Sequence, residues 1–343
     1  MLFRPSASII SSQIAPLFGF LGVEALLVLS GFLIGKNIYA RLVLEDERKL
    51  PNVLSFIKKM AWRFLPLYFL VLLLTLLVSL LYGHPTAEFW KYLVFIQNFS
   101  HPMPALFPES WSITIVFFGS ASLVLMLYFI SKSFGSFNKS KLFLGFTLSM
   151  IGIFVGCKYN YYLHHGDLSL LEWDQQLKAV VIYRLDSFYI GVLCAWLYFN
   201  RSSFWVAYRK VLLLMGILMM LLLFVGVGYF RWLIDSKPFF WEVIYLPLTS
   251  ISIALFLPFL SCLNSQQTFF ERIFSLLSAI SYSLFLIHYS VLLQVFSQFC
   301  NLKEVSSSIF LLLCFVFFVV ALSMSVILYR FCEKPLADIC AKN

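Results

Sequence analysis

Apolar runs recur from one end of this chain to the other, each with the length that a helix needs to cross a membrane. A helix rises about 1.5 Å per residue, so roughly 20 residues span about 30 Å of hydrocarbon. Of the 343 residues, 61% are hydrophobic and 12% are charged, too few charges for a soluble surface. Backbone groups in lipid must be satisfied internally, and runs this long exclude the alternating strands of a barrel. The sequence therefore predicts an all-α fold, a polytopic transmembrane helix bundle.

Nine stretches have the length and composition of membrane spans. They leave no room for a sizeable soluble domain, so residues 1–343 are expected to form a single integral-membrane domain. The predicted spans cover residues 17–36, 64–82, 112–131, 141–157, 179–199, 211–229, 241–261, 275–296 and 308–330.

The basic residues are divided unevenly between alternate loops. Loops on one side of the predicted membrane hold 17 of the 25 Lys and Arg residues, loops on the other side hold seven, and Arg184 lies inside a span. Positively charged loops are retained in the cytoplasm. We therefore expect residues 37–62 and 331–343 to face the cytoplasm, and residues 83–110 and 158–178 to face outside, as in a bacterial inner membrane protein.

The net charge of +9 is spread over short loops and is not gathered into one patch. This distribution favours topology and contact with membrane lipids over binding of nucleic acid. The seven cysteines occur singly, with no CxxC pair and no His at metal-ligand spacing nearby. We expect the cysteines to be apolar fillers, and we expect neither a metal site nor a bound cofactor.

Four ionisable residues within predicted spans are our catalytic candidates: Glu24, Arg184, Asp186 and His288. A charge in a span is costly unless it faces a protein interior or water. Counting about 1.5 Å per residue from the outer end of each span places all four at a similar depth. Arg184 and Asp186 point about 200° apart around one helix, so each needs a partner from another helix. We expect all four to surround a wet cavity that opens to the outside.

A structural role is the alternative for these residues. Buried ion pairs can fix the packing of helices, and His288 can be a neutral imidazole bonded to a neighbouring helix. A further basic group, at the cytoplasmic end of the second predicted span, consists of Lys58, Lys59 and Arg63. Its cations suit either anionic lipid head groups or the phosphates of a soluble donor.

Four stretches resemble, in order and spacing, the motifs of the membrane-bound acyltransferase-3 family. The family's Gly-Val-acidic step into a Ser-Gly-Phe-Leu-Ile helix is matched by GFLGVEALLVLSGFLIG at 19–35. Its basic Arg-x-x-Pro entry to the next span is matched by FIKKMAWRFLPLY at 56–68, and its Arg-x-Asp helix by YRLDSFYIGVLCAWL at 183–197. Its closing pair is matched by SYSLFLIH at 281–288 and EKP at 333–335. The resemblance covers nearly the whole chain.

The resemblance implies transfer of an acyl group, commonly acetyl from acetyl-CoA, to a sugar hydroxyl of an envelope glycan such as lipopolysaccharide O-antigen, exopolysaccharide or peptidoglycan. It also implies a donor on the cytoplasmic side and an acceptor outside. Such a transfer needs a base for the hydroxyl proton and cationic or dipolar groups for the developing oxyanion. We expect the acyl-CoA donor to contact Lys58, Lys59 and Arg63, and the substrate to contact Trp111, Ser112 and Tyr282, which lie in matched segments.

Two features depart from the family pattern. Members carry a further span with an Arg and a His before the stretch that matches Met1 to Leu17, and that His is the family's leading catalytic candidate. The family's Trp-Ser-Leu-x-x-Glu segment is matched by WSITIVF at 111–117, with Val116 in place of the acidic residue. The resemblance therefore predicts no detectable transfer by the 343-residue chain, and transfer by a form extended upstream through the further span.

Other classes of function fit parts of the sequence. A carrier of lipid-linked or acyl-bearing substrates would use the same charged layer without chemistry, although the inverted repeats of such folds are not visible. A non-catalytic remnant would explain the two departures. A structural membrane protein without a small substrate is hard to reconcile with charges inside the spans.

Overall fold

The computed structural model describes residues 9–41, 50–83, 86, 88–133, 138–166, 168–230, 232–263, 269–299, 307–336 and 338. All regular structure within these ranges is helical, with no strand, so the predicted all-α fold is confirmed. The first half of the chain forms α1 (Ile9–Tyr39), α2 (Leu50–Tyr82), α3 (Phe89–Leu93), η2 (Pro108–Ser110), α4 (Trp111–Ser133), α5 (Lys139–His164), α6 (Leu170–Trp173) and η3 (Asp174–Lys178).

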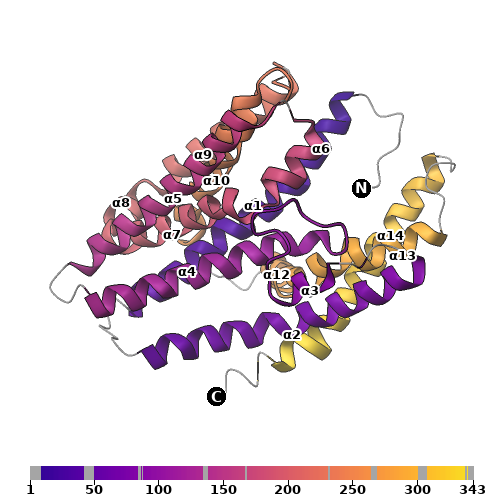
Figure 1. The fold of residues 1–343 in the computed structure, drawn as a ribbon, viewed down its shortest axis with the longest axis horizontal. Coiled ribbons are helices and arrows are strands. Elements are labelled where there is room, and N and C mark those ends of the chain that lie inside the picture. Colours follow the sequence, from indigo (N-terminus) through magenta and orange to yellow (C-terminus); the bar gives the residue numbers. More distant parts are fainter. Residues whose placement is uncertain are drawn as a thin grey trace.

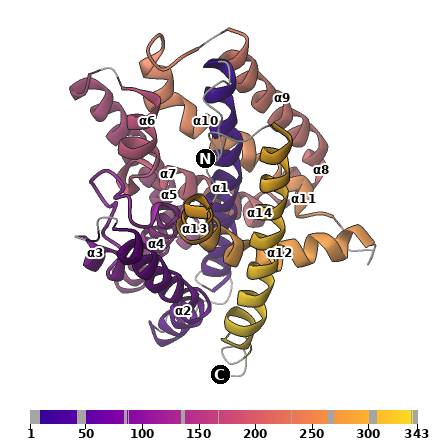
Figure 2. The ribbon, with the colours of Figure 1, turned by 90° about the vertical axis from the view of Figure 1, so that its right-hand side faces the viewer.

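The second half is a further series of helices, several of them interrupted by π-helical turns. It forms η4 (Val181–Tyr183), α7 (Leu185–Asn200), α8 (Ser202–Ala207), α9 (Arg209–Gly228), η5 (Phe240–Ile244), α10 (Tyr245–Ala254), α11 (Leu257–Leu260), α12 (Phe269–Ile287), η6 (His288–Leu293), α13 (Gln294–Phe299), α14 (Ser307–Leu328) and η7 (Tyr329–Glu333). Figures 1 and 2 show α1 near the middle of this bundle.

Eight helical segments in the described part of the chain are long and apolar enough to cross a membrane, judged by length and composition. They confirm a polytopic bundle and match eight of the nine expected spans. The remaining stretch, 179–199, is divided, because η4 ends at Tyr183 and α7 has only 16 residues. Most side chains in the first part of α7 are buried by other helices. A helix surrounded by protein does not have to match the thickness of the lipid.

The contact between α1 and α7 is so close that it requires glycine. A Cβ added at Gly31 of α1 would lie 1.9 Å from the carbonyl oxygen of Phe188, and one added at Gly191 of α7 would lie 2.0 Å from that of Val28. Small residues of this kind let the backbones of membrane helices approach each other. The contact therefore fixes Glu24 on α1 relative to the first turn of α7.

The two helices run in the same direction, and a second polar group joins them at their far ends. The hydroxyl of Tyr39, the last residue of α1, donates to Oγ of Ser140 at 2.9 Å and accepts from Nδ2 of Asn200 at 2.7 Å. Asn200 is the last residue of α7. Hydrogen bonds at both ends thus hold the α1–α7 pair in one register.

The helix α5 extends further than the predicted span of residues 141–157. It continues to His164, so Lys158 lies within the helix and its side chain is fully buried. The expectation that Lys158 belongs to an outer loop is therefore wrong. No Gly or Pro follows until Gly166, so nothing in the sequence stops the helix at residue 157.

Candidate active site

An ion pair between Arg184 and Glu24 joins α1 to the start of α7. Arg184 immediately precedes α7, and its Nη2 donates to Oε2 of Glu24 on α1. Neither side chain is exposed. Arg184 thus takes its partner from another helix, as its position in the sequence requires.

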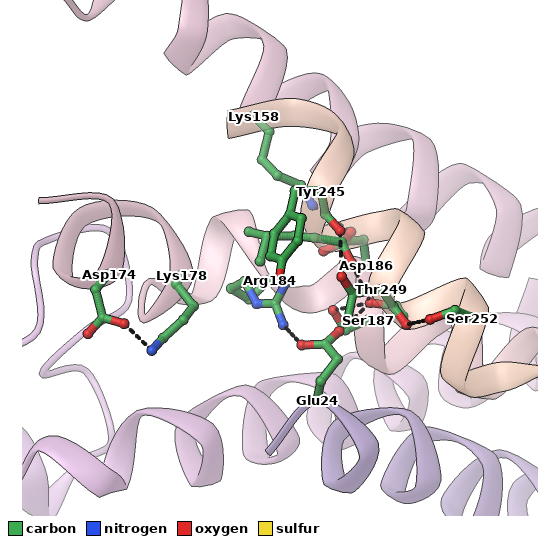
Figure 3. Close-up of polar contacts among 12 residues, drawn as sticks. Glu24, Lys158, Asp174, Lys178, Arg184, Asp186, Ser187, Tyr245, Thr249 and Ser252 are labelled. Carbon is green, nitrogen blue, oxygen red and sulfur yellow. Dashed lines mark hydrogen bonds and ion pairs between the residues drawn. The ribbon is translucent and has the colours of Figure 1, made fainter. Parts of the chain in front are cut away.

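A second ion pair joins α7 to α5. Nζ of Lys158 donates to Oδ2 of Asp186 at 2.6 Å, and both side chains are fully buried (Figure 3). Asp186 lies in the first turn of α7, where the positive end of the helix dipole favours a carboxylate. Asp186 therefore also takes its partner from another helix.

We call Glu24, Lys158, Arg184 and Asp186 the charge centre. The two negative and two positive charges of the centre cancel. Ions can be buried at low cost only when they are paired and hydrogen-bonded. Ser250 of α10 donates to Oε1 of Glu24 and lies 2.9 Å from Oγ of Ser187 on α7. Three helices and the N-terminal end of α7 thus supply the polar contacts around the charge centre (Figure 3).

Three polar atoms of the charge centre have no hydrogen-bond partner in the described part of the chain. They are Nε and Nη1 of Arg184 and Oδ1 of Asp186. A buried charged group with unused donors or acceptors carries a large desolvation cost. The unused guanidinium nitrogens suit an oxygen that accepts hydrogen bonds, and the unused carboxylate oxygen suits a group that donates one.

The charge centre is not a wet cavity open to solvent, and that expectation is wrong. None of its four side chains has measurable exposure. The ring of Phe20 lies 5.5 Å from the guanidinium carbon of Arg184 and 5.7 Å from Nζ of Lys178, which pairs with Asp174. Paired charges do not depend on water for solvation, so helices and aromatic rings can close around them.

His288 lies in a second polar group, which also includes Glu109 and Ser290. Glu109 of η2 is buried and accepts backbone hydrogen bonds from Tyr289 at 3.1 Å and from Ser290 at 2.6 Å. It also accepts one from the hydroxyl of Ser290. The donors of these three hydrogen bonds belong to η6, a π-helical turn. Turns of this kind often occur at functional sites.

The geometry of His288 indicates which ring nitrogen carries the proton in its neutral form. Nδ1 lies 2.7 Å from the carbonyl oxygen of Phe285, and a carbonyl can only accept. The assigned tautomer therefore has its proton on Nδ1 and leaves a lone pair on Nε2. The hydrogen bond described for His288 goes to Phe285 and does not join it to the charge centre.

The predicted substrate residues occupy two different places. Trp111 begins α4 with its ring 5.7 Å from Nζ of Lys178, and the Ser112 hydroxyl donates weakly to the Glu109 carbonyl oxygen at 3.5 Å. Tyr282 lies on α12 instead, where its hydroxyl donates to the carbonyl oxygen of Phe64 at 2.9 Å.

The structure describes some of the remaining motif residues. Val116, where the family has an acidic residue, packs against the apolar core. The closing pair of motifs meets, because the Ser283 hydroxyl donates to Oε2 of Glu333 at 2.9 Å. Lys58, Lys59 and Arg63 belong to α2, but their side chains lie outside the described part of the structure.

Sequence reasoning missed two residues, Lys158 and Glu109. The signal for Lys158 was the lack of a helix stop after residue 157. The signal for Glu109 was its position directly after Pro108 and shortly before the span predicted at 112–131, since Pro is common in the first helical turn. Each supplies a buried charged side chain, one to the charge centre and one beside His288.

The fold and its buried charges define the class of protein. It is an integral membrane protein whose membrane-spanning helices enclose paired ions. The chain belongs to the acyltransferase-3 family, because the model of that family's acyltransferase domain matches residues 2–330. No curated protein and no solved structure matches the chain. Membership supports membrane O-acyl transfer as the general reaction of the family.

Proposed function

We propose that this protein is an O-acyltransferase of the bacterial inner membrane. It moves an acetyl group from acetyl-CoA to a sugar hydroxyl of an envelope glycan, such as O-antigen, exopolysaccharide or peptidoglycan. Family membership supports acyl transfer. The observation that carries the proposal is the set of unpartnered atoms on Arg184 and Asp186. We assign them as the donors and the acceptor that this reaction requires.

In the proposed reaction the sugar hydroxyl attacks the thioester carbonyl. The new bond forms between the hydroxyl oxygen and the acyl carbon, the carbon–sulfur bond breaks, and the hydroxyl proton passes to the enzyme and then to the thiolate. Nε and Nη1 of Arg184 hold the oxyanion that develops on the carbonyl oxygen. Oδ1 of Asp186 accepts the hydroxyl hydrogen bond, and Nε2 of His288 is the alternative proton acceptor.

The other two members of the charge centre position these groups. Glu24 orients the guanidinium of Arg184 through Nη2, which leaves Nε and Nη1 for the substrate. Lys158 holds Oδ2 of Asp186, which leaves Oδ1. On the cytoplasmic side, Lys58, Lys59 and Arg63 would neutralise the phosphates of acetyl-CoA.

The test is the acetyl content of the purified glycan from a host that lacks its own copy of the gene. The protein is expressed as the 343-residue chain and as a form extended by the upstream in-frame codons. The double variant Glu24→Gln/Arg184→Gln removes one charge pair without changing net charge. The matched control, Glu88→Gln/Lys91→Gln, removes a pair that is partly exposed.

We expect transfer by at least one of the two forms, and a loss of at least about 100-fold when that form carries Glu24→Gln/Arg184→Gln, the usual effect of losing an oxyanion donor. The Glu88→Gln/Lys91→Gln control should acetylate as the parent does. Full acetylation by the charge-centre variant would contradict the proposal. Glycan that crosses the membrane without gaining an ester would favour a carrier instead.

A further inference from the structure

The carboxylate of Glu109 binds the backbone of the turn that carries His288. It accepts a hydrogen bond from the backbone N–H of Tyr289 at 3.1 Å and another from the backbone N–H of Ser290 at 2.6 Å. The hydroxyl of Ser290 donates to the second carboxylate oxygen. Both partners follow His288 directly in η6, and Glu109 and Ser290 are buried. Three hydrogen bonds to one carboxylate therefore fix the backbone next to the imidazole.

The bond from Tyr289 bears directly on the hydrogen bond that His288 makes. In a regular α-helix, the N–H of Tyr289 would point at the carbonyl oxygen of Phe285, four residues earlier. Here that N–H donates to Glu109, and the Phe285 carbonyl oxygen lies 2.7 Å from Nδ1 of His288. The regular helix α12 ends just before this point, at Ile287. A backbone donor and acceptor that a regular helix would pair with each other are thus both bonded to side chains.

The short helix η2, which carries Glu109, is itself held by buried side chains. Pro108 begins η2, and its ring fixes the φ angle of the backbone there. The hydroxyl of Ser110 donates to the carbonyl oxygen of Phe107 at 2.7 Å, and Nε2 of Gln97 donates to Oγ of Ser110 at 3.2 Å. The helix η2 packs against both α12 and η6. Glu109 therefore has the rigid support that a group needs in order to position another group.

A carboxylate elsewhere in the chain makes similar bonds in a different setting. Glu172 accepts from the backbone N–H of Ser169 at 2.8 Å and from its hydroxyl at 2.7 Å, in a capping box at the start of α6. Glu172 is exposed, and its bonds serve only to begin a helix. Glu109 makes its bonds from a buried position beside an imidazole, where an ionised group is costly. The comparison favours a role for Glu109 beyond local helix structure.

We propose that Glu109 is a positioning residue for His288. Its bond to the Tyr289 N–H leaves the Phe285 carbonyl oxygen to Nδ1–H of His288, and this bond keeps the lone pair on Nε2. The proposal rests on the proposed function, in which Nε2 of His288 is the alternative proton acceptor. The proton of the sugar hydroxyl passes to Nε2 and then to the thiolate. Glu109 acts through the length of its side chain and touches no substrate.

Two substitutions separate the length of this side chain from its charge. Glu109→Gln keeps the length and removes the charge, and its amide can accept both N–H groups with its oxygen and donate to Ser290 with its nitrogen. Glu109→Asp keeps the charge but is shorter by one methylene, so its oxygens are drawn back from η6. The matched controls are Glu172→Gln and Glu172→Asp, which alter a carboxylate with similar partners in the capping box of α6.

Two measurements are made on each variant. The first is the kcat and the KM for acceptor glycan and for acetyl-CoA, in membranes that contain the form that acetylates glycan in cells. The second is the tautomer of His288, read from the ¹⁵N NMR signals of the 343-residue chain labelled at histidine in lipid bilayers. The chain has five histidines, so the signals of His288 are assigned by their loss in His288→Gln. The Tm of each purified variant shows whether it is folded.

We expect Glu109→Asp to lower kcat by about 100-fold with both KM values near those of the parent, since misplacing a reacting group can cost that much. In this variant the Nδ1–H tautomer of His288 should give way to the Nε2–H tautomer. Glu109→Gln should keep the Nδ1–H tautomer and a kcat within about 10-fold of the parent's, because it can make the same three hydrogen bonds. Both Glu172 variants should match the parent in kcat and in the tautomer of His288.

Parental kcat in Glu109→Asp, or an unchanged His288 tautomer in that variant, would overturn the proposal. So would a Glu109→Gln variant that keeps the parent's Tm but loses as much kcat as Glu109→Asp, because charge and not length would then matter. A parent that transfers no acetyl would overturn the proposed function. The positioning of His288 would still stand if its tautomer changed in Glu109→Asp and was kept in Glu109→Gln.

Discussion

Each ion of the charge centre has its partner on a different part of the fold, so the strength of each pair depends on tertiary packing. Arg184 meets Glu24 across the α1–α7 contact, and Asp186 meets Lys158 across the α5–α7 contact. Removing one partner leaves a bare charge in a buried position, whereas removing both leaves a neutral space. Comparing the single variant with the double variant therefore separates the structural contribution of an ion pair from its contribution to the reaction.

The pair Lys158 and Asp186 offers the cleaner experiment. Lys158→Met should destabilise the protein by about 3–5 kcal/mol, because Asp186 then lacks its counter-ion. The double variant Lys158→Met/Asp186→Leu should recover stability to within about 1–2 kcal/mol of the parent, since apolar side chains can replace a buried pair. Thermal unfolding in detergent measures both. The double variant should still fail to transfer acetyl, because the acceptor oxygen of Asp186 is gone.

A Lys158→Met variant as stable as the parent would contradict the burial of this ion pair. Restored transfer in the double variant would show that Asp186 has a structural role only. The control is Lys237→Met, a lysine of the segment between α9 and η5, which should leave stability within about 0.5 kcal/mol because it touches no ion pair of the charge centre.

At the scale of helices, the α1–α7 contact is what aligns the charge centre. Gly31 and Gly191 face backbone carbonyl oxygens of the opposite helix at distances that no side chain can share. A carbonyl oxygen is part of the backbone and cannot rotate away, so any added group pushes the helices apart. Separation of the helices would then carry Glu24 away from Arg184.

We expect Gly31→Ala and Gly191→Ala each to lower stability by at least about 1–3 kcal/mol, the usual cost of overpacking, and to abolish acetyl transfer. The control is Gly22→Ala in the same helix, where an added Cβ meets nothing within 4 Å. That variant should be neutral or stabilised by up to about 1 kcal/mol, because alanine favours a helix. Wild-type Tm and transfer in Gly31→Ala would contradict the close contact.

The depth of each residue below the outer end of its predicted span was sufficient to predict part of the site, but not the rest. Glu24 and Arg184 lie at equal depths on two predicted spans, and they meet. Equal depth does not say which helices are neighbours, however, and the hydrogen bond described for His288 goes to Phe285 and not to these residues. Lys158 was missed because the end of a helix is poorly marked when no Gly or Pro stops it.

At the scale of the whole molecule, the long apolar runs were sufficient to predict the all-α bundle, and the order of the motifs was sufficient to predict the family. The packing of α7 inside the bundle was not predictable, because a short buried helix has the same apolar composition as a lipid-facing one. The unpartnered atoms of Arg184 and Asp186 could not be predicted from the sequence either, since they depend on which side chains meet.

The uneven distribution of basic residues makes a prediction for the whole molecule. Single cysteines introduced by Lys49→Cys and Lys342→Cys into a cysteine-free background should be protected from a membrane-impermeant thiol reagent added to intact cells. A cysteine introduced by His101→Cys should be labelled. Labelling of Lys342→Cys from outside, with His101→Cys protected, would reverse the orientation and place the acyl donor and acceptor on the wrong sides.

The most direct measurement of acyl transfer is the passage of labelled acetyl from acetyl-CoA to glycan in inverted membrane vesicles, with free CoA thiol counted in the same sample. The parent, in the form that acetylates glycan in cells, should label the glycan and release one thiol for each ester formed, and the same form with Glu24→Gln/Arg184→Gln should do neither while remaining inserted. Labelled glycan in equal amounts from the parent and from this variant would contradict the account. So would a parent that releases no thiol and labels no glycan.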